Sequence, residues 1–256
     1  MAFYDDIGEK YDMMIRWKTR LEREAPFFQR LFSENRIQRV LDLGCGTGHH
    51  SELFHKWGST VVGIDPSATL IERARERIVN EEDDTLSFVQ SDLTHFSEVV
   101  SGEFDAVISL GNTLPHLQHE DELDHAFDTI HQVLRPGGVF VFQNRNYDRL
   151  LKTKERFLLP TTHRQADSEQ IFFRFNDFEG DKVRFNIVHF TRVGEGWIHE
   201  VFSTELSPWL QTTLEESVKK AGFHSLDFYG DFSGTPFDHE SSNDVVGLAR
   251  KSQNKA

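Results

Sequence analysis

A strand-like stretch that runs directly into glycines at every second position is the feature that most constrains this chain. Residues 40–48 read VLDLGCGTG, so the apolar run is followed by Gly44, Gly46 and Gly48. Glycine loses more conformational freedom on folding than any other residue. It is therefore used where the chain must turn tightly or where a ligand or another segment comes close to the backbone. The loop also opens a helix-like segment, whose first N–H groups are free to bind a ligand. We therefore expect a ligand at this loop, with a tight turn that binds nothing as the alternative.

An acidic residue at the end of the next strand-like run strengthens this interpretation. The run TVVGID (60–65) ends at Asp65, 17 residues after Gly48, and an acid in this place can bind the two hydroxyl groups of a ribose. The dinucleotide fingerprint G-x-G-x-x-G would need a third glycine at position 49, where this chain has His49. The loop and the acid together indicate a ribose-containing ligand, and the missing glycine disfavours a nicotinamide enzyme.

Strand-like and helix-like segments alternate through the first 150 residues. Strands are expected at 39–44, 60–65, 86–92, 104–111 and 139–146, and helices at 48–58, 67–80 and 121–138. Before them, the helical period over 11–33 predicts one or two helices with a break near Pro26. Alternation at this spacing predicts a parallel, doubly wound sheet with helices on both faces.

The chain changes character after residue 150. Residues 170–206 show no helical period and consist of strand-like runs separated by EGD and GEG, which predict hairpin turns. A helix over 210–222 and two late strands follow. We expect this antiparallel material to join the edge of the parallel sheet.

Charge and composition limit the partners of the chain. Its 256 residues include 42 acidic and 28 Lys or Arg side chains, for a net charge of −14, which repels phosphate backbones and anionic membranes, so neither nucleic acid nor membrane is an expected partner. The single cysteine, Cys45, fits a reducing compartment. The first twelve residues resemble no secretory signal and no spanning helix is expected, so we expect a cytoplasmic protein. The histidines lack metal-ligand spacing, so no metal is expected, and the oligomeric state stays open.

Four segments in this order, VLDLGCGTG, VVGIDPS, FVQSDL and FDAVISLGN, resemble the nucleoside-binding half of class I S-adenosylmethionine-dependent methyltransferases. The resemblance implies S-adenosyl-L-methionine as the cofactor. It also implies an α/β fold with a Rossmann-like, doubly wound, seven-stranded, mostly parallel sheet, and here an antiparallel β insertion in the second half. Three parts are then expected: an N-terminal helical lid (1–36), a cofactor-binding methyltransferase domain (37–150 and 207–251) and an antiparallel substrate-side insertion (151–206).

The same resemblance implies which residues bind the cofactor. The glycine loop would face its methionine part, Asp65 would hold its ribose, and Asp92 with the Leu93 backbone would meet its adenine. Leu110 would lie against the cofactor near the transfer site. The segment RWKTRLERE (16–24) resembles an N-terminal segment of the related N-methyltransferases. In that segment an arginine holds the carboxylate of the cofactor, and an aromatic residue covers the methionine chain of the cofactor. The complete set is Trp17, Arg20, Gly44, Cys45, Gly46, Asp65, Pro66, Asp92, Leu93 and Leu110.

Three of these positions keep a plain structural alternative. Asp92 is also placed to cap a following helix, and Leu110 to fill the core. Arg20 also fits the wet basic face of an amphipathic helix.

A closer resemblance appears further along the chain. DAVISLGNTLPHL (105–117), LRPGGVFVFQNRNYD (134–148) and GDFSGTPFD (230–238) are similar to glycine and glycine/sarcosine N-methyltransferases. This resemblance implies that Asn112 and Arg145 hold an amino acid substrate, and a guanidinium suits a carboxylate because it donates two hydrogen bonds to it. A turn-stabilising amide and a surface salt bridge are the alternatives for these two residues.

Aromatic residues and one histidine complete the expected substrate site. Tyr11 would line the substrate cavity, and Tyr4 is equally suited to do so. His116 is near the site by sequence, with a structural role as its alternative.

These features predict an enzyme that methylates a small amine such as glycine or sarcosine by direct in-line transfer. No catalytic residue is assigned, because the sulfonium of the cofactor already activates the methyl group. Another small acceptor (an amino sugar or a hydroxyl compound) is the first alternative, and a protein that binds S-adenosylmethionine without catalysis is the second. A DNA amino-methyltransferase is disfavoured, because GNTLPHL stands where an [Asp/Asn]-Pro-Pro-aromatic motif is expected.

Overall fold

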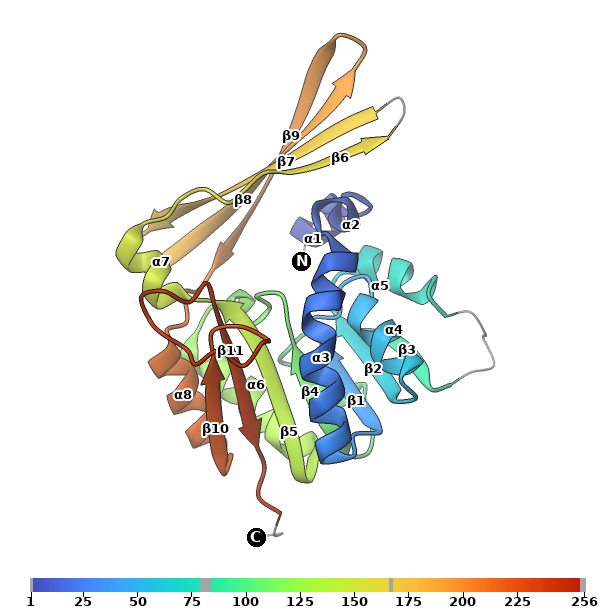
Figure 1. The fold of residues 1–256 in the computed structure, drawn as a ribbon, viewed down its shortest axis with the longest axis vertical. Coiled ribbons are helices and arrows are strands. Elements are labelled where there is room, and N and C mark those ends of the chain that lie inside the picture. Colours follow the sequence, from blue (N-terminus) through green and yellow to red (C-terminus); the bar gives the residue numbers. More distant parts are fainter. Residues whose placement is uncertain (1, 79–83, 166–167, 254–256) are drawn as a thin grey trace.

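Two β-sheets organise the chain, whose computed structural model describes residues 2–78, 84–165 and 168–253 (Figure 1). The larger sheet has seven strands in the order β10-β11-β5-β4-β1-β2-β3. Its strands are β1 (Arg39–Leu43), β2 (Thr60–Asp65), β3 (Leu86–Gln90), β4 (Phe104–Ser109), β5 (Leu134–Arg145), β10 (Ser225–Tyr229) and β11 (Asp244–Arg250). Strand β11 runs antiparallel to β10 and β5, and the other strand pairs of this sheet are parallel, so the predicted doubly wound, mostly parallel sheet is confirmed.

The strand order places a crevice beside the glycine loop. Strand β1 pairs in parallel with β2 on one side and with β4 on the other, so the winding of the sheet reverses between β1 and β4. Ligands of open α/β sheets bind at the carboxyl ends of the strands where this reversal occurs. The loop after β1 and the residues after β4 therefore meet at the expected binding edge.

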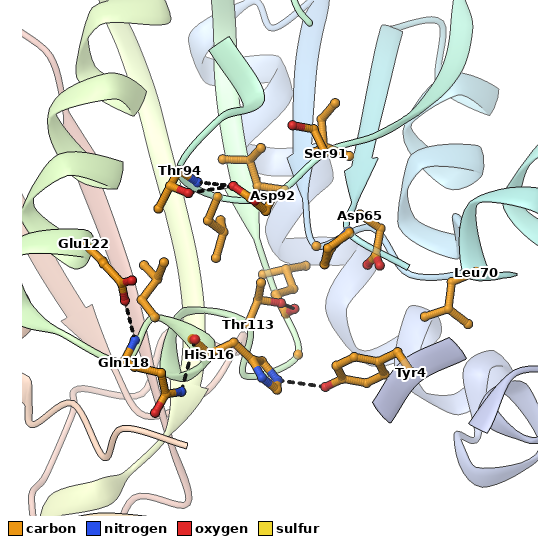
Figure 2. Close-up of a pocket in the computed structure, with 18 of the residues that line it drawn as sticks. Tyr4, Asp65, Leu70, Ser91, Asp92, Thr94, Thr113, His116, Gln118 and Glu122 are labelled. Carbon is orange, nitrogen blue, oxygen red and sulfur yellow. Dashed lines mark hydrogen bonds between the residues drawn. The ribbon is translucent and has the colours of Figure 1, made fainter. Parts of the chain in front are cut away.

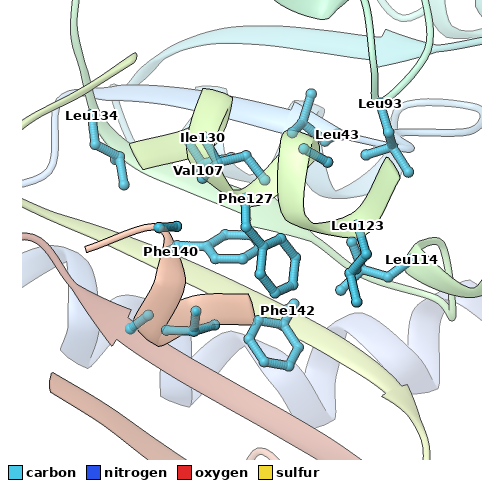
Figure 3. Close-up of a cluster of buried hydrophobic side chains, with 14 of the residues drawn as sticks. Leu43, Leu93, Val107, Leu114, Leu123, Phe127, Ile130, Leu134, Phe140 and Phe142 are labelled. Carbon is cyan, nitrogen blue, oxygen red and sulfur yellow. The ribbon is translucent and has the colours of Figure 1, made fainter. Parts of the chain in front are cut away.

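Helices cover both faces of this sheet. The set comprises α3 (Trp17–Asn35), α4 (His49–Lys56), α5 (Ala68–Arg75), α6 (Glu120–Val133) and α8 (Gln211–Lys220), with the short 3-10 helices η1 (Phe96–Glu98) and η2 (Leu114–His116). Helices α3, α4 and α5 pack on one face through Phe28, Phe54 and Ala74. Helix α6 packs on the other through Phe127, beside Phe140 of β5 (Figure 3). Since apolar residues line both faces of the sheet, the core has two layers.

Helix α3 corrects the predicted break at Pro26. The helix continues through this proline, although proline in a helix interior costs about 3 kcal/mol. The residues that follow it, Phe27 and Phe28, are buried against the sheet side of the helix, and this packing holds the chain helical. The actual interruption lies at Ile15, whose backbone is extended.

Two further helix ends differ from the predictions. Helix α6 ends at Val133 rather than at Gly138, because Leu134 is already extended and pairs with Phe104 of β4. Helix α5 ends at Arg75, and the last two residues of the predicted helix, 79–80, lie outside the described residues. Its predicted start is confirmed, since the Ser67 hydroxyl accepts a hydrogen bond from the Leu70 N–H.

The antiparallel material after residue 150 divides into two parts: the late strands β10 and β11 join the edge of the first sheet as expected, whereas residues 161–206 form a separate second sheet, which corrects the expectation for that stretch. Its strands pair in the order β6-β7-β8-β9 and are β6 (Thr161–Gln165), β7 (Ser168–Glu179), β8 (Lys182–Val193) and β9 (Gly196–Leu206). The EGD and GEG hairpins are confirmed, because β7 pairs antiparallel with β8, and β8 with β9. Strand β6 was not predicted, and its polar sequence TTHRQ shows why.

The second sheet lies over the carboxyl ends of the first, with two short N-terminal helices between them (Figure 1). These helices are α1 (Ala2–Ile7) and α2 (Lys10–Met14), and α7 (Tyr147–Thr153) follows β5. Phe3 and Ile7 of α1 pack with Phe172 and Ile187 of the second sheet. This contact covers the binding edge from above. Within the described residues, no helix has the length and apolar character needed to cross a bilayer.

Candidate functional site

The glycine loop turns through backbone conformations that other residues adopt poorly. Gly44, Gly46 and Gly48 all have positive φ, at 79°, 56° and 78°. A side chain on Gly44 would collide with Thr113, and one on Gly46 would stand 3.4 Å from the ring of Tyr11. The loop therefore needs glycine both for its own turn and for the close approach of neighbouring segments.

Asp65 ends β2 and is tied to this loop. Its Oδ2 accepts a hydrogen bond from the Gly46 N–H, and its Oδ1 accepts one from the Ser67 N–H, both at 2.9 Å. Burial raises the pKa of the carboxyl group to about 6, although these two hydrogen bonds oppose the shift. The carboxylate is thus held in place by neutral donors and is ionised at neutral pH.

A cavity of about 220 Å³ opens between the glycine loop, the ends of β2 and β4, and α1 (Figure 2). Leu43, Leu70 and Leu93 provide apolar surface, and Asp65 and Asp92 provide carboxylates. Of the residues predicted to bind a cofactor or substrate, those that line the cavity are Tyr11, Gly44, Asp65, Pro66, Asp92, Leu93, Leu110 and His116. Trp17, Arg20, Cys45, Gly46, Asn112 and Arg145 were predicted but lie around it.

The chemistry of this lining fits S-adenosylmethionine. Apolar side chains suit the flat faces of an adenine, and the buried Asp65 carboxylate suits hydroxyl donors such as those of a ribose. The bare backbone of the glycine loop permits close approach of a ligand. The cofactor predicted from the sequence and the cavity observed in the structure are thus compatible.

Asp92 makes the contacts of a capping residue while it also lines the cavity. Its Oδ1 accepts hydrogen bonds from the N–H groups of Thr94 and His95, at 2.8 and 2.9 Å. The carboxyl group is nearly half exposed, and its contacts with Thr94 and His95 lower its pKa against the effect of burial. The cap fixes its position, so the capping alternative and the predicted adenine contact are compatible.

Tyr4 and His116 close the cavity on the side of α1. The Tyr4 hydroxyl lies 2.9 Å from Nε2 of His116 and forms a hydrogen bond with it (Figure 2). Burial lowers the pKa of His116 to about 4, so its ring is neutral at physiological pH. Tyr11 stands next to Tyr4, with the two ring centroids 6.0 Å apart. Both predicted tyrosines therefore reach the cavity, which provides uncharged polar groups at this end.

Trp17 and Arg20 lie behind the glycine loop, at the start of α3. The Trp17 ring stacks on His49, with centroids 4.1 Å apart. Arg20 Nε donates to Glu24, and the Arg20 side chain is only 18% exposed, so the wet-face alternative for this residue is wrong. Its guanidinium lies where it would contact a side chain added at Gly111, a cavity residue. Arg20 therefore does not line the cavity itself but lies next to Gly111, which does.

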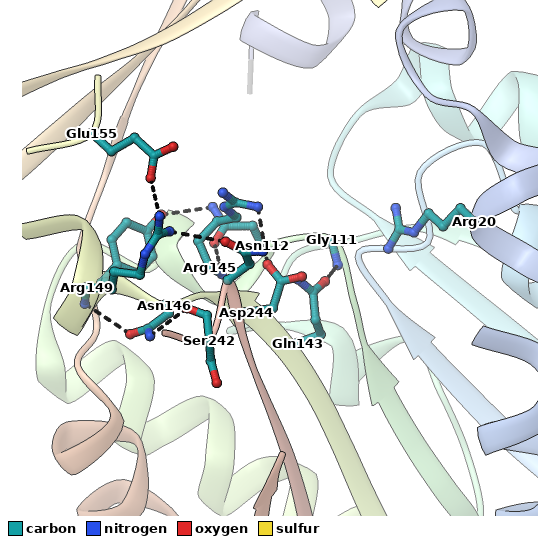
Figure 4. Close-up of polar contacts among 12 residues, drawn as sticks. Arg20, Gly111, Asn112, Gln143, Arg145, Asn146, Arg149, Glu155, Ser242 and Asp244 are labelled. Atoms are coloured by element: carbon teal, nitrogen blue, oxygen red, sulfur yellow. Dashed lines mark hydrogen bonds and ion pairs between the residues drawn. The ribbon is translucent and has the colours of Figure 1, made fainter. Parts of the chain in front are cut away.

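Asn112 and Arg145 come together next to the cavity, in a group that we name the Arg145 cluster: Asn112, Arg145, Tyr147 and Asp244 (Figure 4). The Asn112 side chain accepts from the Arg145 backbone N–H at 3.0 Å and donates to the Tyr147 hydroxyl at 2.9 Å. The Arg145 guanidinium donates to Asp244 at 3.3 Å and is about one third exposed. Both residues therefore make the structural contacts given above as alternatives: Asn112 fixes the backbone at Arg145, and Asp244 holds the Arg145 guanidinium.

Two residues of this region were missed from the sequence. Gln143 accepts a hydrogen bond from the Gly111 N–H and so fixes the loop after β4. Tyr147 is 2% exposed, and burial raises the pKa of its hydroxyl to about 12. Their positions in the sequence could have indicated them. Gln143 and Tyr147 each lie two residues from Arg145, at the carboxyl end of a strand, where ligands of this fold class bind.

Comparisons with known proteins relate this chain to methyltransferases. Residues 40–138 match the model of a family described as "Methyltransferase domain". The chain is 37% identical over 150 residues to a glycine/sarcosine N-methyltransferase of Parasynechococcus marenigrum, covering 59% of this chain and 53% of that protein. It is 27% identical to a glycine/sarcosine N-methyltransferase of Aphanothece halophytica, covering 97% of this chain and 89% of that protein. The match thus spans about half of the first relative and most of the second.

A solved structure extends the comparison to the whole fold. The crystal structure of an S-adenosylmethionine-dependent methyltransferase from Clostridium acetobutylicum superposes with a TM-score of 0.79 at 20% identity. The superposition covers 97% of this chain and 99% of that one. The second sheet is therefore part of an architecture that occurs elsewhere.

Proposed function

We propose that this chain is a class I S-adenosylmethionine-dependent methyltransferase that methylates the amino nitrogen of a small amino acid such as glycine or sarcosine. The names of the relatives from Parasynechococcus marenigrum and Aphanothece halophytica support this acceptor. We also propose that the predicted cofactor and substrate residues that meet at the cavity act in the roles given above.

The observation that carries the proposal is the position of Arg145. Its backbone N–H donates to Asn112, and Asn112 lies between Gly111 and Thr113, which both line the cavity. A guanidinium held here is suited to bind a carboxylate by two parallel hydrogen bonds. An amino acid bound in this way has its amine within a few atoms of the cavity, since amine and carboxylate share one carbon.

The groups at the cavity end suit an uncharged amine. Only the deprotonated amine has the lone pair that attacks a methyl group. His116, with a pKa of about 4, is neutral at physiological pH and can hydrogen-bond to such an amine. Tyr4 fixes the ring of His116 through their hydrogen bond. We assign these two residues to orienting the amine rather than to removing its proton.

The rate enhancement then comes chiefly from orientation and from exclusion of water. When bound, S-adenosylmethionine supplies a methyl group that its sulfonium already activates. Helices α1 and α2 and the second sheet cover the site, so the chain holds the acceptor away from bulk solvent. Well-oriented reactants reach effective concentrations on the order of 10⁵–10⁸ M. No covalent intermediate with the protein is needed.

A methyl-transfer screen tests this proposal. The protein is incubated with methyl-labelled S-adenosylmethionine and, separately, glycine, sarcosine, dimethylglycine or glucosamine, and products are identified by mass spectrometry. We expect label on the nitrogen of glycine or sarcosine. Label on glucosamine alone, with cofactor binding intact, would instead establish an amino-sugar acceptor and refute the amino acid.

A variant pair sharpens the same test. R145Q removes the guanidinium and should raise the amino acid KM by about 10- to 100-fold, the usual effect of losing a hydrogen bond to a charged group. R184Q is the matched control, because Arg184 pairs with Glu179 and is about half exposed on the β7–β8 hairpin. Equal KM values for the two variants would contradict the role of Arg145.

A further inference from the structure

A short segment of the cavity wall, residues 114–118, is bound to the base of the second sheet. The segment consists of η2 and the two residues after it, and the last three of its residues line the cavity. The Ser207 N–H donates to the carbonyl oxygen of Pro115 at 2.8 Å, and the Trp209 ring N–H donates to that of Leu114 at 3.2 Å. Since Ser207 directly follows β9, the end of this strand is attached to the wall of the cavity.

Lys182, the first residue of β8, completes the attachment. Its Nζ donates to the carbonyl oxygen of Gln118 at 2.5 Å and to the Ser207 hydroxyl at 2.7 Å. The Ser207 hydroxyl donates to the same carbonyl oxygen at 3.0 Å, and the Gln118 side chain donates to the carbonyl oxygen of Glu205, on β9, at 3.1 Å. We name Lys182, Ser207 and Gln118 the Lys182 clamp, because they join the cavity segment to two strands of the second sheet.

The chemistry of this clamp makes it stronger than an ordinary contact between loops. A hydrogen bond from a charged donor is roughly twice as strong as one between neutral groups, and the Lys182 ammonium supplies two such bonds. Ser207 is buried, so these bonds form away from water, where the electrostatic part of a hydrogen bond is larger. The clamp therefore restricts the position of the segment that it holds.

His116 lies between this clamp and the N-terminal helices. Its backbone carbonyl oxygen accepts a hydrogen bond from the Gln118 side chain at 3.1 Å (Figure 2). Its ring forms the 2.9 Å hydrogen bond with Tyr4 of α1, and α1 packs on the second sheet through the contact of Phe3 with Phe172. The second sheet thus reaches His116 by two routes, through the clamp to its backbone and through α1 to its ring.

We propose that Lys182 and Ser207 are positioning residues for His116, and that the Lys182 clamp sets the place of the His116 ring in the cavity and with it the orientation of the acceptor amine. This inference rests on the proposed function, in which His116 orients the amine, and it gives the second sheet a part in the transfer step. Neither Lys182 nor Ser207 lines the cavity, so both act through residues 114–118. A misplacement of about 1 Å can cost on the order of a hundredfold in rate.

The first test is the turnover of clamp variants. K182M removes the ammonium group and keeps an apolar chain of similar length, so kcat for sarcosine should fall by about tenfold or more. The Kd for S-adenosylmethionine, measured by isothermal calorimetry, should stay within about twofold of the wild-type value. K182R keeps a charged donor and should recover most of the lost kcat. S207A removes the hydroxyl alone and should lower kcat by about two- to tenfold.

The second test follows the His116 ring without any acceptor. The ring is titrated by NMR on the full chain labelled at its histidines, with H116Q to identify the signals. In the wild-type chain burial lowers the pKa of His116 to about 4. In K182M the released segment admits water to the ring, so this pKa should rise toward the ordinary value of about 6.5. Thermal unfolding of each variant verifies that it is folded.

K219M is the matched control. Lys219 lies on α8, is about two-thirds exposed and pairs with Glu215 at 2.5 Å. K219M removes one ammonium group, as K182M does, but it removes it from a surface pair outside the clamp. It should leave kcat within about twofold of the wild-type value and the titration of His116 unchanged.

The outcomes distinguish this inference from the proposed function. Wild-type kcat and titration in folded K182M, with active wild-type protein, would overturn the inference and leave the function standing. A lower kcat without a change in the His116 titration would also overturn it, because the effect would not pass through this ring. Equal losses in K182M and K219M would show a general effect of charge and overturn it as well.

One further outcome would separate the two in the other direction. If the wild-type protein methylates glucosamine and no amino acid, kcat is measured with glucosamine instead of sarcosine. A raised pKa of His116 and a lower kcat in K182M would then support the clamp and refute the proposed acceptor.

Discussion

Two regions of this protein bury charged side chains in opposite ways. In the first, Glu24 of α3 is 2% exposed and contacts the guanidinium groups of Arg20 and Arg23 at 3.1 Å and the ring of His50 at 2.8 Å. Elsewhere, Asp65 accepts hydrogen bonds from two backbone N–H groups, and Arg174 of β7 donates to the neutral oxygens of Leu159 and Thr161. The pKa of Glu24 is lowered to about 2 and that of Asp65 is raised to about 6.

This difference teaches how a structural charge differs from a binding charge. Glu24 is neutralised by its own chain, so it holds α3 to the start of α4 and has no need of a ligand. Asp65 and Arg174 are held by hydrogen bonds to neutral groups, and within the part of the chain that the structure describes neither has an oppositely charged side chain at ion-pair distance. A buried charge without a counter-charge costs free energy, and binding a complementary group recovers part of that cost.

Removing Glu24 should have the largest effect on stability. E24A leaves the largely buried Arg20 guanidinium without its carboxylate, and breaking a buried ion pair costs about 3–5 kcal/mol. The free energy of unfolding is measured by urea denaturation. E22A is the control, because Glu22 is an exposed glutamate of the same helix, and it should change the free energy of unfolding by less than about 0.5 kcal/mol. Similar losses of unfolding free energy in E24A and E22A would contradict the structural role assigned to Glu24.

Removing the charge of Asp65 should act on the cofactor more than on the fold. D65N keeps the shape but removes the anionic acceptor, so the Kd for S-adenosylmethionine should rise by about 10- to 100-fold. Isothermal calorimetry measures it, with D227N at an exposed position of β10 as the control. Wild-type affinity in folded D65N would refute the assigned role of Asp65.

The pKa of Asp65 predicts a pH dependence for the same affinity. Below pH about 6 the carboxyl group becomes protonated, so the Kd for S-adenosylmethionine should rise with falling pH, by up to about tenfold per unit. The effect on folding has the opposite sign: the folded state binds this proton more tightly than the unfolded state, so acidification between pH 6 and 3.8 adds stability through this group. Calorimetry of the wild-type chain between pH 5 and 8, with D65N as the reference, measures the binding part. A wild-type Kd that is flat across this range would contradict the prediction.

Removing the charge of Arg174 should have the smallest effect on stability. R174M replaces a charge without an acidic partner by an apolar chain of similar length, so the free energy of unfolding should stay within about 1 kcal/mol of the wild-type value or increase. Urea denaturation compares R174M with E24A. If R174M lost as much unfolding free energy as E24A, Arg174 would also be a structural charge, and the distinction drawn between the two kinds of buried charge would fail.

The parts of this protein that follow from local sequence could be predicted. The glycine loop and Asp65 lie on consecutive strands, so alternation and spacing were sufficient to bring them together. The parallel sheet could be predicted in the same way, because its strands alternate with helices along the sequence. Pro26 shows the limit of local reasoning, because burial of Phe27 and Phe28 overrides its cost within the helix.

The acceptor side depends on contacts between distant segments. Tyr4 meets His116 across 112 positions of sequence, and the second sheet lies over the binding edge through contacts of Phe172 and Ile187 with α1. In the sequence, Arg174 belongs to QIFFRFNDFE, where alternation predicts a strand but does not show what each face covers. Burial and the lack of an acidic partner became visible only with the three-dimensional arrangement.

A crystal structure of the chain with S-adenosylhomocysteine and sarcosine tests the central claim most directly. The account predicts that the sarcosine carboxylate contacts Arg145, with its nitrogen directed toward the cavity beside Leu110 and His116. Sarcosine bound with its carboxylate away from Arg145 would contradict the account.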